Sequence, residues 1–433
     1  MDRSILRQLI NWQNSTNRKP LLLRGARQVG KTYIVRELGK KYFNGSFHQF
    51  NFEKNPELNR IFDSNLDSRR ILAELELEVN SRIVPGKDLV FFDEVQDCPK
   101  AIMSLRYFFE ENPELHIIAA GSLIEFSLQE ISFPVGRVHT MNMHPMSFSE
   151  FLIATGKSLL AENLATKHDP FSEPIINKLN TELSNYFVVG GMPECVKTFR
   201  DTNSFKEVTL LQSDLITTFR QDFSKYSGKA DKRCLNQVLN SLSGKIGNQI
   251  IYSHLSKEFT QPTIKKAFDL LSTARLFYKI KSASPDGIPL NNYISSKRFK
   301  TIFLDIGLLS CLNGYYKSDS RSDPYLNPGF RGMMAEQFIG QELLALLDTE
   351  IFYWSREARG SSAETDFLIQ YDDTILPIEV KSGKSGRLTS LHLLMNSYPN
   401  LKKSIVFTKD KYGTLKNPTI EFLPLFEIAS FSK

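Results

Sequence analysis

The sequence predicts an α/β protein made of three parts: a parallel-sheet part at residues 1–150, a helical part with a winged-helix segment at 151–320, and an αβββαβ tail at 325–433. Strand–turn–helix patterns mark the first part, helical periodicity the second, and short apolar strands the third. A chain of 433 residues is also longer than a single core normally supports, so several compact units are expected.

Apolar runs typical of buried parallel strands mark the first part. A helical pattern covers Ser4–Gln13, and "KPLLLRGARQVGKTYIVRELGKKY" then runs from a strand through a glycine-bearing turn into an amphipathic helix. The segments "DLVFFDEVQ" and "ELHIIAAGS" are further apolar runs bounded by polar turns. We therefore expect a parallel sheet with helices between its strands.

The second part is mostly helical from about Asn142 to Leu312, with breaks at "GGMPE", "FTQP" and "SPDGIP". We expect "GGMPE" to start a helix with Pro193 in its first turn. Asp305 in "FLDIGLL" is expected to cap another helix rather than to catalyse a reaction.

A winged helix is predicted within Asn248–Ser282. The pattern there gives a helix, a break at Thr260–Pro262, a second helix and a β-rich run, with Thr263–Ala274 in the position of a recognition helix. Lys265 and Lys266 could contact phosphate there. The alternative is a packing module with two solvated lysines, because many winged helices only bind protein or connect domains.

The tail follows a segment rich in Ser, Asp, Pro and Gly, Ser318–Phe330, which is typical of a linker. Turns are expected at "ARGSS" and "DD". The expected elements are a helix at Met333–Leu347, strands at 351–357, 365–371 and 375–381, a helix near Leu388–Asn396 and a strand at 403–409.

The composition is that of a globular protein, with 41% apolar and 24% charged residues. The net charge of +6 permits a polyanionic partner without requiring one. Four cysteines without paired spacing argue against a zinc site or a disulfide framework. Because the chain shows no cleavable leader pattern and no apolar run of membrane length, we expect a cytoplasmic protein without a membrane partner.

The strongest motif is a phosphate-binding loop that fits GxxxxGK[ST] in full, between a strand and a helix. Its backbone N–H groups and the following helix N-terminus would surround the phosphates of ATP. Lys31 would reach the β and γ phosphates, and the Thr32 hydroxyl would bind Mg²⁺. The residues expected to bind the nucleotide here are Gly25, Ala26, Arg27, Gln28, Val29, Gly30, Lys31 and Thr32.

An acidic pair ends the next apolar strand, in "LVFFDEVQ". Asp93 would engage the Mg²⁺ shell and Glu94 would orient or deprotonate the attacking water. An acidic pair alone could merely cap a helix, but together with the phosphate-binding loop it favours hydrolysis. A transferase fits poorly, because no lid or acceptor-site signature accompanies the pair.

Two further residues are candidates for the nucleotide site. Ser122, at the end of "HIIAAGS", could contact the γ-phosphate or the water, or it could be a turn residue. Arg137, in "FPVGRVH", could stabilise charge as an arginine finger from the same chain or from a neighbouring subunit. Its alternative is a surface ion pair.

The tail carries a constellation used by metal-dependent nucleases. In "TILPIEVKSG" side chains alternate, so Glu379 and Lys381 share a face while Ile378 and Val380 are expected in the core on the other. Asp366 in the preceding strand can lie beside them, and Glu336 in the preceding helix is the natural fourth member. Carboxylates suit Mg²⁺, and the lysine could orient a water. Alternatively, these residues form ordinary ion pairs.

The motifs "LLLRGARQVGKT", "LVFFDEVQ", "GR" before "HPMSFSEFL", "GGMPE", "FLDIGLL" and "ETDF...PIEVKSG" are spread over nearly the whole chain. Together they resemble a family of bacterial and archaeal AAA+-type P-loop ATPases with a C-terminal domain related to PD-(D/E)xK nucleases. The resemblance implies an AAA-type ATPase core, a helical or winged-helix middle and a restriction-endonuclease-like tail. Thr365 stands where the nuclease signature has proline, so the match does not establish cleavage. The matching positions are Lys31, Thr32, Asp93 and Glu94 in the core and Glu336, Asp366, Glu379 and Lys381 in the tail.

Two functions from different classes are consistent with these residues. The first is a Mg²⁺-dependent ATPase whose nucleotide state repositions a middle and tail that associate with DNA, with or without cleaving it. The second is a signalling or assembly switch, in which ATP sets a homo-oligomeric or protein-bound state and the tail is an inactive nuclease fold that contacts protein. DNA-dependent ATP hydrolysis would favour the first, and nucleotide-dependent assembly without DNA affinity the second.

Overall fold

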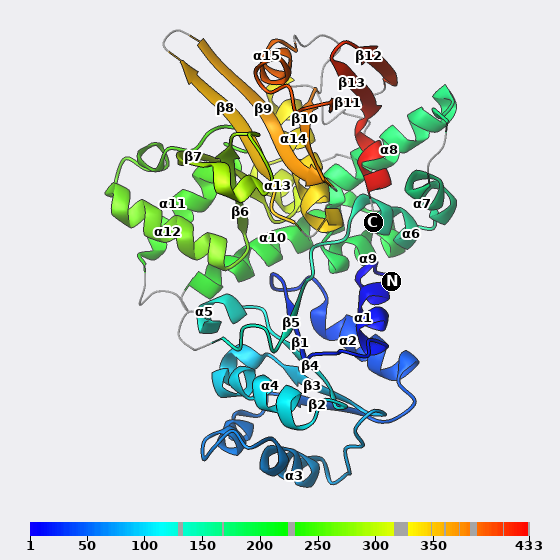
Figure 1. The fold of residues 1–433 in the computed structure, drawn as a ribbon, viewed down its shortest axis with the longest axis vertical. Helices are drawn as coiled ribbons and strands as arrows, with labels where there is room; N and C mark the ends of the chain where they lie inside the picture. The colour runs from blue at the N-terminus through cyan, green and yellow to red at the C-terminus, as the bar shows by residue number, and fades with distance from the viewer. Residues whose placement is uncertain are drawn as a thin grey trace. The chain divides into compact units, whose positions relative to one another are not determined.

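The computed structural model describes residues 1–128, 133–166, 169–223, 230–315, 328–347, 349–358, 361–371, 373–381, 388–409 and 411–431. The chain divides into two compact units, Met1–His144 and Pro145–Lys433 (Figure 1). Over the residues described, no helix has both the length and the apolar character that a membrane crossing requires.

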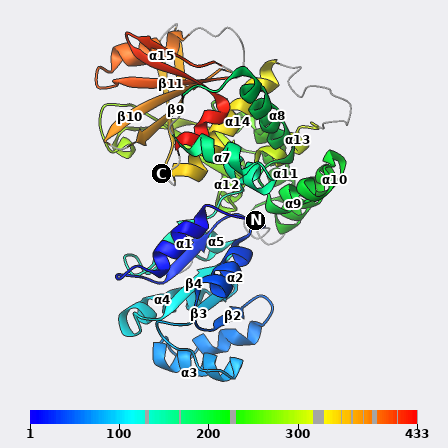
Figure 2. The ribbon, with the colours of Figure 1, turned by 90° about the vertical axis from the view of Figure 1, so that its right-hand side faces the viewer.

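The first unit contains a five-stranded sheet in the order β2-β3-β4-β1-β5, in which every neighbouring pair is parallel. Parallel strands need crossover helices, which cover both faces of the sheet. Figure 2 shows α2 and α4 on opposite sides of the strands. The strands are β1 (Leu21–Arg24), β2 (Phe47–Asn51), β3 (Leu89–Asp93), β4 (His116–Ala120) and β5 (His139–Asn142); the helices are α1 (Ile5–Gln13), α2 (Lys31–Tyr42), η1 (Pro56–Phe62), α3 (Ser68–Val79), η2 (Val95–Asp97), α4 (Pro99–Glu111) and α5 (Ile124–Leu128).

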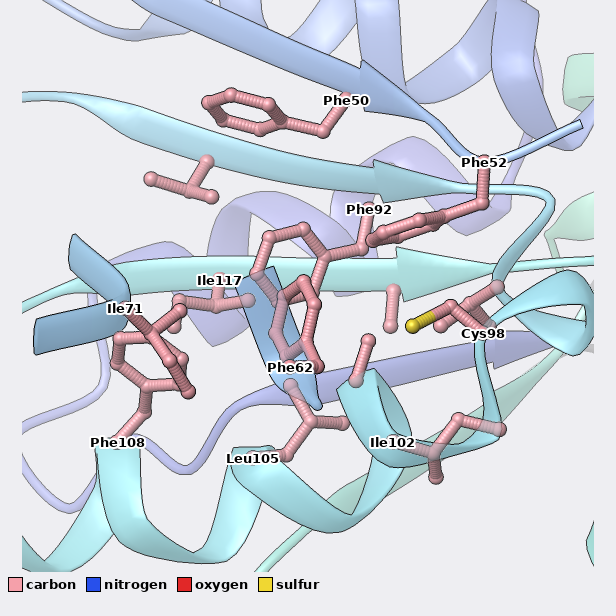
Figure 3. Packing of buried hydrophobic residues seen from close by; sticks show 14 of the residues in the cluster. Phe50, Phe52, Phe62, Ile71, Phe92, Cys98, Ile102, Leu105, Phe108 and Ile117 are labelled. Carbon is pink, nitrogen blue, oxygen red and sulfur yellow. The ribbon is translucent and has the colours of Figure 1, made fainter. Parts of the chain in front are cut away.

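An aromatic core fixes one face of this sheet against α3 and α4 (Figure 3). The Phe62 ring lies edge-on to Phe52 and Phe92, with centroid separations of 5.7 and 5.8 Å. On the other face, α2 approaches so closely that a Cβ on Gly39 would lie 2.4 Å from the Phe47 ring. The packing on both faces therefore sets the position of α2, whose first residues belong to the phosphate-binding loop.

The predicted strands and helices around the nucleotide motifs are confirmed: β1, α2, β3 and β4 lie where the sequence indicated. The sequence analysis did not anticipate β2 and β5. β2 alternates buried and half-buried side chains, and β5 has a single buried residue, so neither has a continuous apolar run. Strand pairing, rather than local hydrophobicity, forms them.

The second unit contains a mixed eight-stranded sheet in the order β12-β13-β11-β10-β9-β8-β6-β7. Its hairpin β6–β7 precedes residue 320 in the chain, and β6 pairs in parallel with β8, which follows it. The middle and the tail thus share one sheet. The strands are β6 (Phe277–Ala283), β7 (Ile294–Phe303), β8 (Phe352–Ala358), β9 (Ser361–Tyr371), β10 (Thr374–Val380), β11 (Lys403–Thr408), β12 (Gly413–Lys416) and β13 (Thr419–Pro424).

Helices pack around this sheet, with α14 against β7 and β10 and α15 against β9. The predicted helix at "GGMPE" is α9, with Pro193 in its first turn, and Asp305 caps α13 by accepting a hydrogen bond from Leu308 N at 3.0 Å. The helices are α6 (Phe148–Ala154), α7 (Ser158–Ala165), α8 (Glu173–Val189), α9 (Pro193–Thr202), α10 (Phe205–Asp222), α11 (Lys232–Ser243), η4 (Tyr252–His254), α12 (Gln261–Thr273), η5 (Leu290–Tyr293), α13 (Ile306–Leu312), α14 (Pro328–Leu347), α15 (Thr389–Ser397) and η6 (Leu425–Phe431).

One predicted helix is wrong. The segment that begins at Asn248 holds a single β-bridge and the short η4, and the α-helix before it, α11, has already ended at Ser243. Gly247 adopts a φ of +82°, which interrupts helical geometry. Ile250 N then donates to Phe299 O at 2.7 Å, so the apolar residues here join a sheet instead of a helix.

The tail follows the predicted αβββαβ order as α14, β8, β9, β10, α15 and β11. The hairpin β12–β13 and the final η6 were not predicted. Of the predicted linker, residues 318–327 lie outside the described part of the chain, as do parts of the turns at "ARGSS" and "DD". The division into three domains stays a prediction.

Candidate nucleotide site and acidic cluster

The phosphate-binding loop connects β1 to α2 in an unusual backbone conformation. Gly25 has a φ of +155°, and a Cβ there would lie 2.4 Å from Met143 O, so only glycine fits. Gly30, with a φ of 98°, comes directly before α2, and Gln28 has a φ of 65° although it is not glycine. Such conformations concentrate at functional loops, where the fold holds them in place. Ala26 and Val29 are buried and anchor the loop.

Lys31 closes this loop. Its side chain is buried, and its ammonium donates to Gly25 O at 2.8 Å and to Ala26 O at 2.7 Å. A lysine ammonium at the start of a helix that follows a glycine-bearing loop is an arrangement that suits a nucleotide phosphate. The loop therefore fits the phosphates of a nucleotide.

Thr32 and Asp93 meet at the entrance of the loop. Thr32 Oγ1 donates to Asp93 Oδ1 at 2.9 Å, so a hydroxyl and a carboxylate predicted from separate motifs lie together. Burial raises the pKa of Asp93, and the neighbouring Glu94 raises it further. Oxygen donors of this kind suit Mg²⁺, and a bound cation would favour the ionised carboxylate.

Two residues that the sequence analysis missed hold Asp93 in place. Gln49 Nε2 and Asn51 Nδ2, both from β2, donate to Asp93 Oδ2 at 2.7 and 3.0 Å. One carboxylate oxygen is thus fixed by the neighbouring strand while the other faces Thr32. The available signal was the alternation of polar Gln49 and Asn51 with buried residues, but it acquires meaning only once β2 is known to pair with β3.

The structure brings Glu94 and Ser122 together at the ends of the adjacent strands β3 and β4. Glu94 Oε2 accepts hydrogen bonds from Ser122 Oγ at 3.3 Å and from Gln96 Nε2 at 2.9 Å. A Cβ on Gly121 would lie 2.0 Å from Gln96 Oε1, so this glycine makes room for the glutamine. The sequence analysis also missed Gln96, whose hydrogen bond positions the side chain of Glu94. The backbone of Glu94 has a left-handed φ of 51°.

Arg137 lies at the opposite end of the sheet from the phosphate-binding loop. Two residues after it, His139 pairs with Leu21 at the start of β1, whereas the loop follows the end of β1. Arg137 Nε donates to Glu110 Oε1 at 2.9 Å, which is the surface ion pair of the alternative interpretation. A contribution to its own chain's site does not fit this geometry. That Arg137 of a second copy of the chain completes this nucleotide site stays a prediction.

In the second unit, Lys300 lies among three carboxylates. Its Nζ is 2.8 Å from Glu336 Oε1, 2.5 Å from Glu364 Oε1 and 3.3 Å from Asp366 Oδ1. The lysine is 1% exposed. Burial acts to lower its pKa, but the three carboxylates hold the pKa well above its ordinary value.

The predicted tail residues lie around this lysine. Lys381 Nζ is 2.5 Å from Glu379 Oε1, and Asp366 Oδ2 accepts a hydrogen bond from Val380 N at 2.8 Å. Ile378 is buried as expected, but Glu379 is buried too and Val380 is only half-buried, so the strand lacks the expected alternation. Burial raises the pKa of Glu379 to about 8 and that of Glu336 to about 7. We call the set Lys300, Glu336, Glu364, Asp366, Glu379 and Lys381 the acidic cluster.

The loop after α11 closes one side of the acidic cluster. Gln249 Nε2 donates to Glu364 Oε2 at 2.6 Å, and Arg298 donates to Gln249 Oε1 at 3.0 Å. A Cβ on Gly247 would lie 2.4 Å from Glu336 Oε2, so the backbone of this loop lies directly against the carboxylate. The cluster is therefore covered by residues from the middle of the chain.

Divalent metal does not fit the acidic cluster in this arrangement. Glu336, Asp366 and Glu379 were the expected ligands, but the first two are paired with Lys300, and Glu379 is paired with Lys381. Over the ranges that the structure describes, no group of three or more His, Cys, Asp or Glu side chains could hold a metal ion. Sequence reasoning missed both Lys300 and Glu364, because Lys300 lies in no motif and Glu364, although part of "ETDF", was assigned no role.

Comparison with known proteins accounts for the first unit. Residues 17–152 match the family model described as an AAA domain. They form an AAA-type P-loop ATPase domain. Residues 180–319 and 331–428 match two domains of unknown function (DUF8612 and DUF4143). The AAA domain indicates ATP binding and hydrolysis, and such domains usually use Mg²⁺.

The protein relatives that match are uncharacterised. One from Haemophilus influenzae is 26% identical over 216 residues, covering 47% of this chain and 48% of the relative. The uncharacterised protein MJ1544 from Methanocaldococcus jannaschii is 25% identical over 248 residues, covering 53% of this chain and 52% of the relative. The chain thus matches about half the length of these curated relatives.

Solved structures with some similarity include a Walker-type ATPase of Pyrococcus abyssi, with a TM-score of 0.47, 16% identity, and coverage of 72% of this chain and 95% of that one. The Aeropyrum pernix ORC1 protein in complex with DNA has a TM-score of 0.30 and 10% identity, and covers 71% of this chain and 91% of that one.

Proposed function

We propose that the AAA domain hydrolyses ATP, with Mg²⁺ bound by Thr32 and Asp93 and the attacking water oriented by Glu94. The observation that carries this proposal is the 2.9 Å contact between Thr32 Oγ1 and Asp93 Oδ1, next to Glu94 in the chain. A P-loop NTPase binds its metal with a threonine hydroxyl and an aspartate of this kind.

Each residue has a distinct role in this proposal. The Lys31 ammonium exchanges the carbonyls of Gly25 and Ala26 for β- and γ-phosphate oxygens. The backbone N–H groups of the loop and the start of α2 bind the remaining phosphate oxygens. When bound, Mg²⁺ supplies positive charge that neutralises the developing charge on the phosphates.

Hydrolysis, rather than transfer to another acceptor, is favoured by the surroundings of Glu94. Its Oε2 is held by Gln96 and Ser122, which fixes the carboxylate at the ends of β3 and β4. A carboxylate fixed in this way can accept a proton from a water beside the γ-phosphate.

A hydrolysis assay on Glu94→Gln tests the proposal. We expect the variant to bind ATP with wild-type affinity and to hydrolyse it at least about 100-fold more slowly, because general-base catalysis contributes factors of that size. Glu53→Gln, at an exposed glutamate in the same unit, is the matched control and should hydrolyse at the wild-type rate. Unchanged hydrolysis by Glu94→Gln would refute the assignment of the base.

For the second unit we propose association with DNA under control of the nucleotide. Support comes from the order of its elements: α11, the bridge between Ile250 and Phe299, α12 and the hairpin β6–β7 follow each other as in a winged helix. Lys265 and Lys266 are exposed on α12, the helix in the recognition position. Lysines at such a position contact phosphate and make binding dependent on salt.

Binding of duplex DNA by Lys265→Glu/Lys266→Glu tests this association. We expect the double variant to lose most of the affinity and to show a weaker dependence on salt, because two phosphate contacts are removed. Lys206→Glu, on the exposed side of α10, is the control. If wild type binds no DNA and instead assembles when ATP is added, the protein is a switch that acts through protein contacts, and the DNA proposal fails.

A further inference from the structure

The acidic cluster already contains a cation, the Lys300 ammonium. It contacts Glu336 from α14 and both Glu364 and Asp366 from β9, while Lys300 itself comes from β7. An ammonium group has three N–H donors, and here three carboxylates surround it, one for each donor. Lys300 thus takes the central position that a divalent ion would need in order to share these carboxylates.

Two of the remaining carboxylate oxygens are also occupied. Asp366 Oδ2 accepts from Val380 N, and Glu364 Oε2 accepts from Gln249. Glu379 Oε2 is buried without a hydrogen-bond partner among the described residues. Glu336 Oε2 and Glu379 Oε2 therefore remain, but each belongs to a carboxylate that is already paired with a lysine, so a divalent ion there would face the charge of Lys300 or Lys381.

Lys300 is locked in this position by its surroundings. It lies within β7, at a residue paired with Ile280 of β6, and its Nζ is 5.5 Å from the centroid of the Tyr353 ring. Its side chain is only 2% exposed. Moving the ammonium away would leave it without carboxylate partners and would leave three partly buried carboxylates without their counter-charge, which is unfavourable. Metal and Lys300 therefore exclude each other.

We propose that Lys300 permanently replaces a divalent cation in the acidic cluster, so that the second unit binds no metal there and does not cleave nucleic acid. The cluster instead joins β7, from the middle of the chain, to α14 and β9 of the tail. This inference goes beyond the proposed ATPase and does not depend on it, because every residue involved belongs to the second unit.

Mn²⁺ binding to the intact protein without nucleotide, followed by electron paramagnetic resonance, tests the proposal. We expect wild type and Asp366→Asn to bind Mn²⁺ identically, because the cluster contributes no site. Lys300→Met should gain one Mn²⁺ site, and Lys300→Met/Asp366→Asn should lose it again. Lys279→Met, at an exposed lysine in the adjacent strand β6, is the control and should gain none.

Two results would overturn the proposal. The first is a Mn²⁺ site in wild type that Asp366→Asn removes, or Mn²⁺-dependent plasmid cleavage that the same substitution removes. The second is a folded Lys300→Met protein that binds no additional Mn²⁺. A melting temperature of Lys300→Met that rises when Mn²⁺ is added, without a similar rise for Lys279→Met, would support the proposal. If Lys300→Met does not fold at all, the wild-type and Asp366→Asn comparison decides.

Discussion

The Thr32 hydroxyl donates a hydrogen bond of 2.9 Å to Asp93 Oδ1, which joins the first turn of α2 to the end of β3. A helix start and a strand end that are distant in sequence thus place a hydroxyl and a carboxylate in contact with each other. The predictions for the AAA domain depend on this contact between Thr32 and Asp93 and on the residues that hold the two side chains in place.

Gln49 and Asn51 should tune metal affinity, because both donate to Asp93 Oδ2 and so orient its other oxygen. Loss of a group that hydrogen-bonds to a metal ligand typically changes metal affinity by about 10–100-fold. We expect Gln49→Ala/Asn51→Ala to need about 10-fold more Mg²⁺ for half-maximal ATP hydrolysis. A Mg²⁺ titration measures this, with Asn59→Ala as the control. An unchanged titration would show that the two amides are structural only.

Gln96 should act on the rate of hydrolysis through Glu94, whose Oε2 accepts its hydrogen bond. We expect Gln96→Ala to lower kcat about 10-fold while KM for ATP and the melting temperature stay unchanged, because a misplaced general base affects only the chemical step. Steady-state kinetics separate the two parameters. A rise in KM with unchanged kcat would instead assign Gln96 to nucleotide binding.

Arg137 should act on a neighbouring copy if it acts at all, since it lies at the opposite end of its own sheet from the loop. We expect Arg137→Ala to lower hydrolysis at least about 100-fold. Mixing it with Glu94→Gln should restore part of the activity, because the Arg137→Ala chain keeps its Glu94 and receives the arginine of its neighbour. Arg106→Ala, which removes the other partner of Glu110, is the control. Absence of recovery in the mixture would contradict supply in trans.

Glu342 should make the second unit less stable as the pH rises. Burial raises its pKa to about 8, although Phe148 N donates to Oε1 at 2.9 Å. The pKa of Glu342 is higher in the folded chain than in the unfolded chain, so protonation of Glu342 stabilises the fold. This stabilisation is fully present below the unfolded pKa and is lost as the pH rises to about 8. The loss is on the order of a few kcal/mol.

Thermal melts from pH 5 to pH 9 check this dependence. Glu342→Gln keeps the acceptor for Phe148 N and cannot ionise, so it should exceed wild type in stability most at high pH. Glu162→Gln, at an exposed glutamate, should follow the wild-type curve. Equal slopes for wild type and Glu342→Gln would show that another group controls the pH dependence.

The sequence revealed the parts of the nucleotide site that are local in the chain. Gly25–Thr32 forms a loop whose chemistry depends only on consecutive residues, and Asp93 with Glu94 ends an apolar strand. Gln49 and Asn51 escaped detection because their role arises from the pairing of β2 with β3. A half-buried polar strand has no local pattern that identifies its neighbours.

The tail was harder to predict for the same reason. The order of elements from α14 to β11 followed from local periodicity, and Glu336, Asp366, Glu379 and Lys381 do lie near one another. Lys300, the residue that decides what the cluster can bind, lies on a strand from the middle of the chain. Only the shared sheet brings it to the carboxylates.

The most direct test of the account is Mg²⁺-dependent ATP hydrolysis by Thr32→Val compared with Thr32→Ser. Valine keeps the shape of threonine and removes only the hydroxyl that contacts Asp93, whereas serine keeps a hydroxyl. The account predicts that Thr32→Ser hydrolyses ATP within a few-fold of wild type and that Thr32→Val loses at least about 100-fold. Hydrolysis by Thr32→Val at the wild-type rate and Mg²⁺ dependence would contradict the central claim.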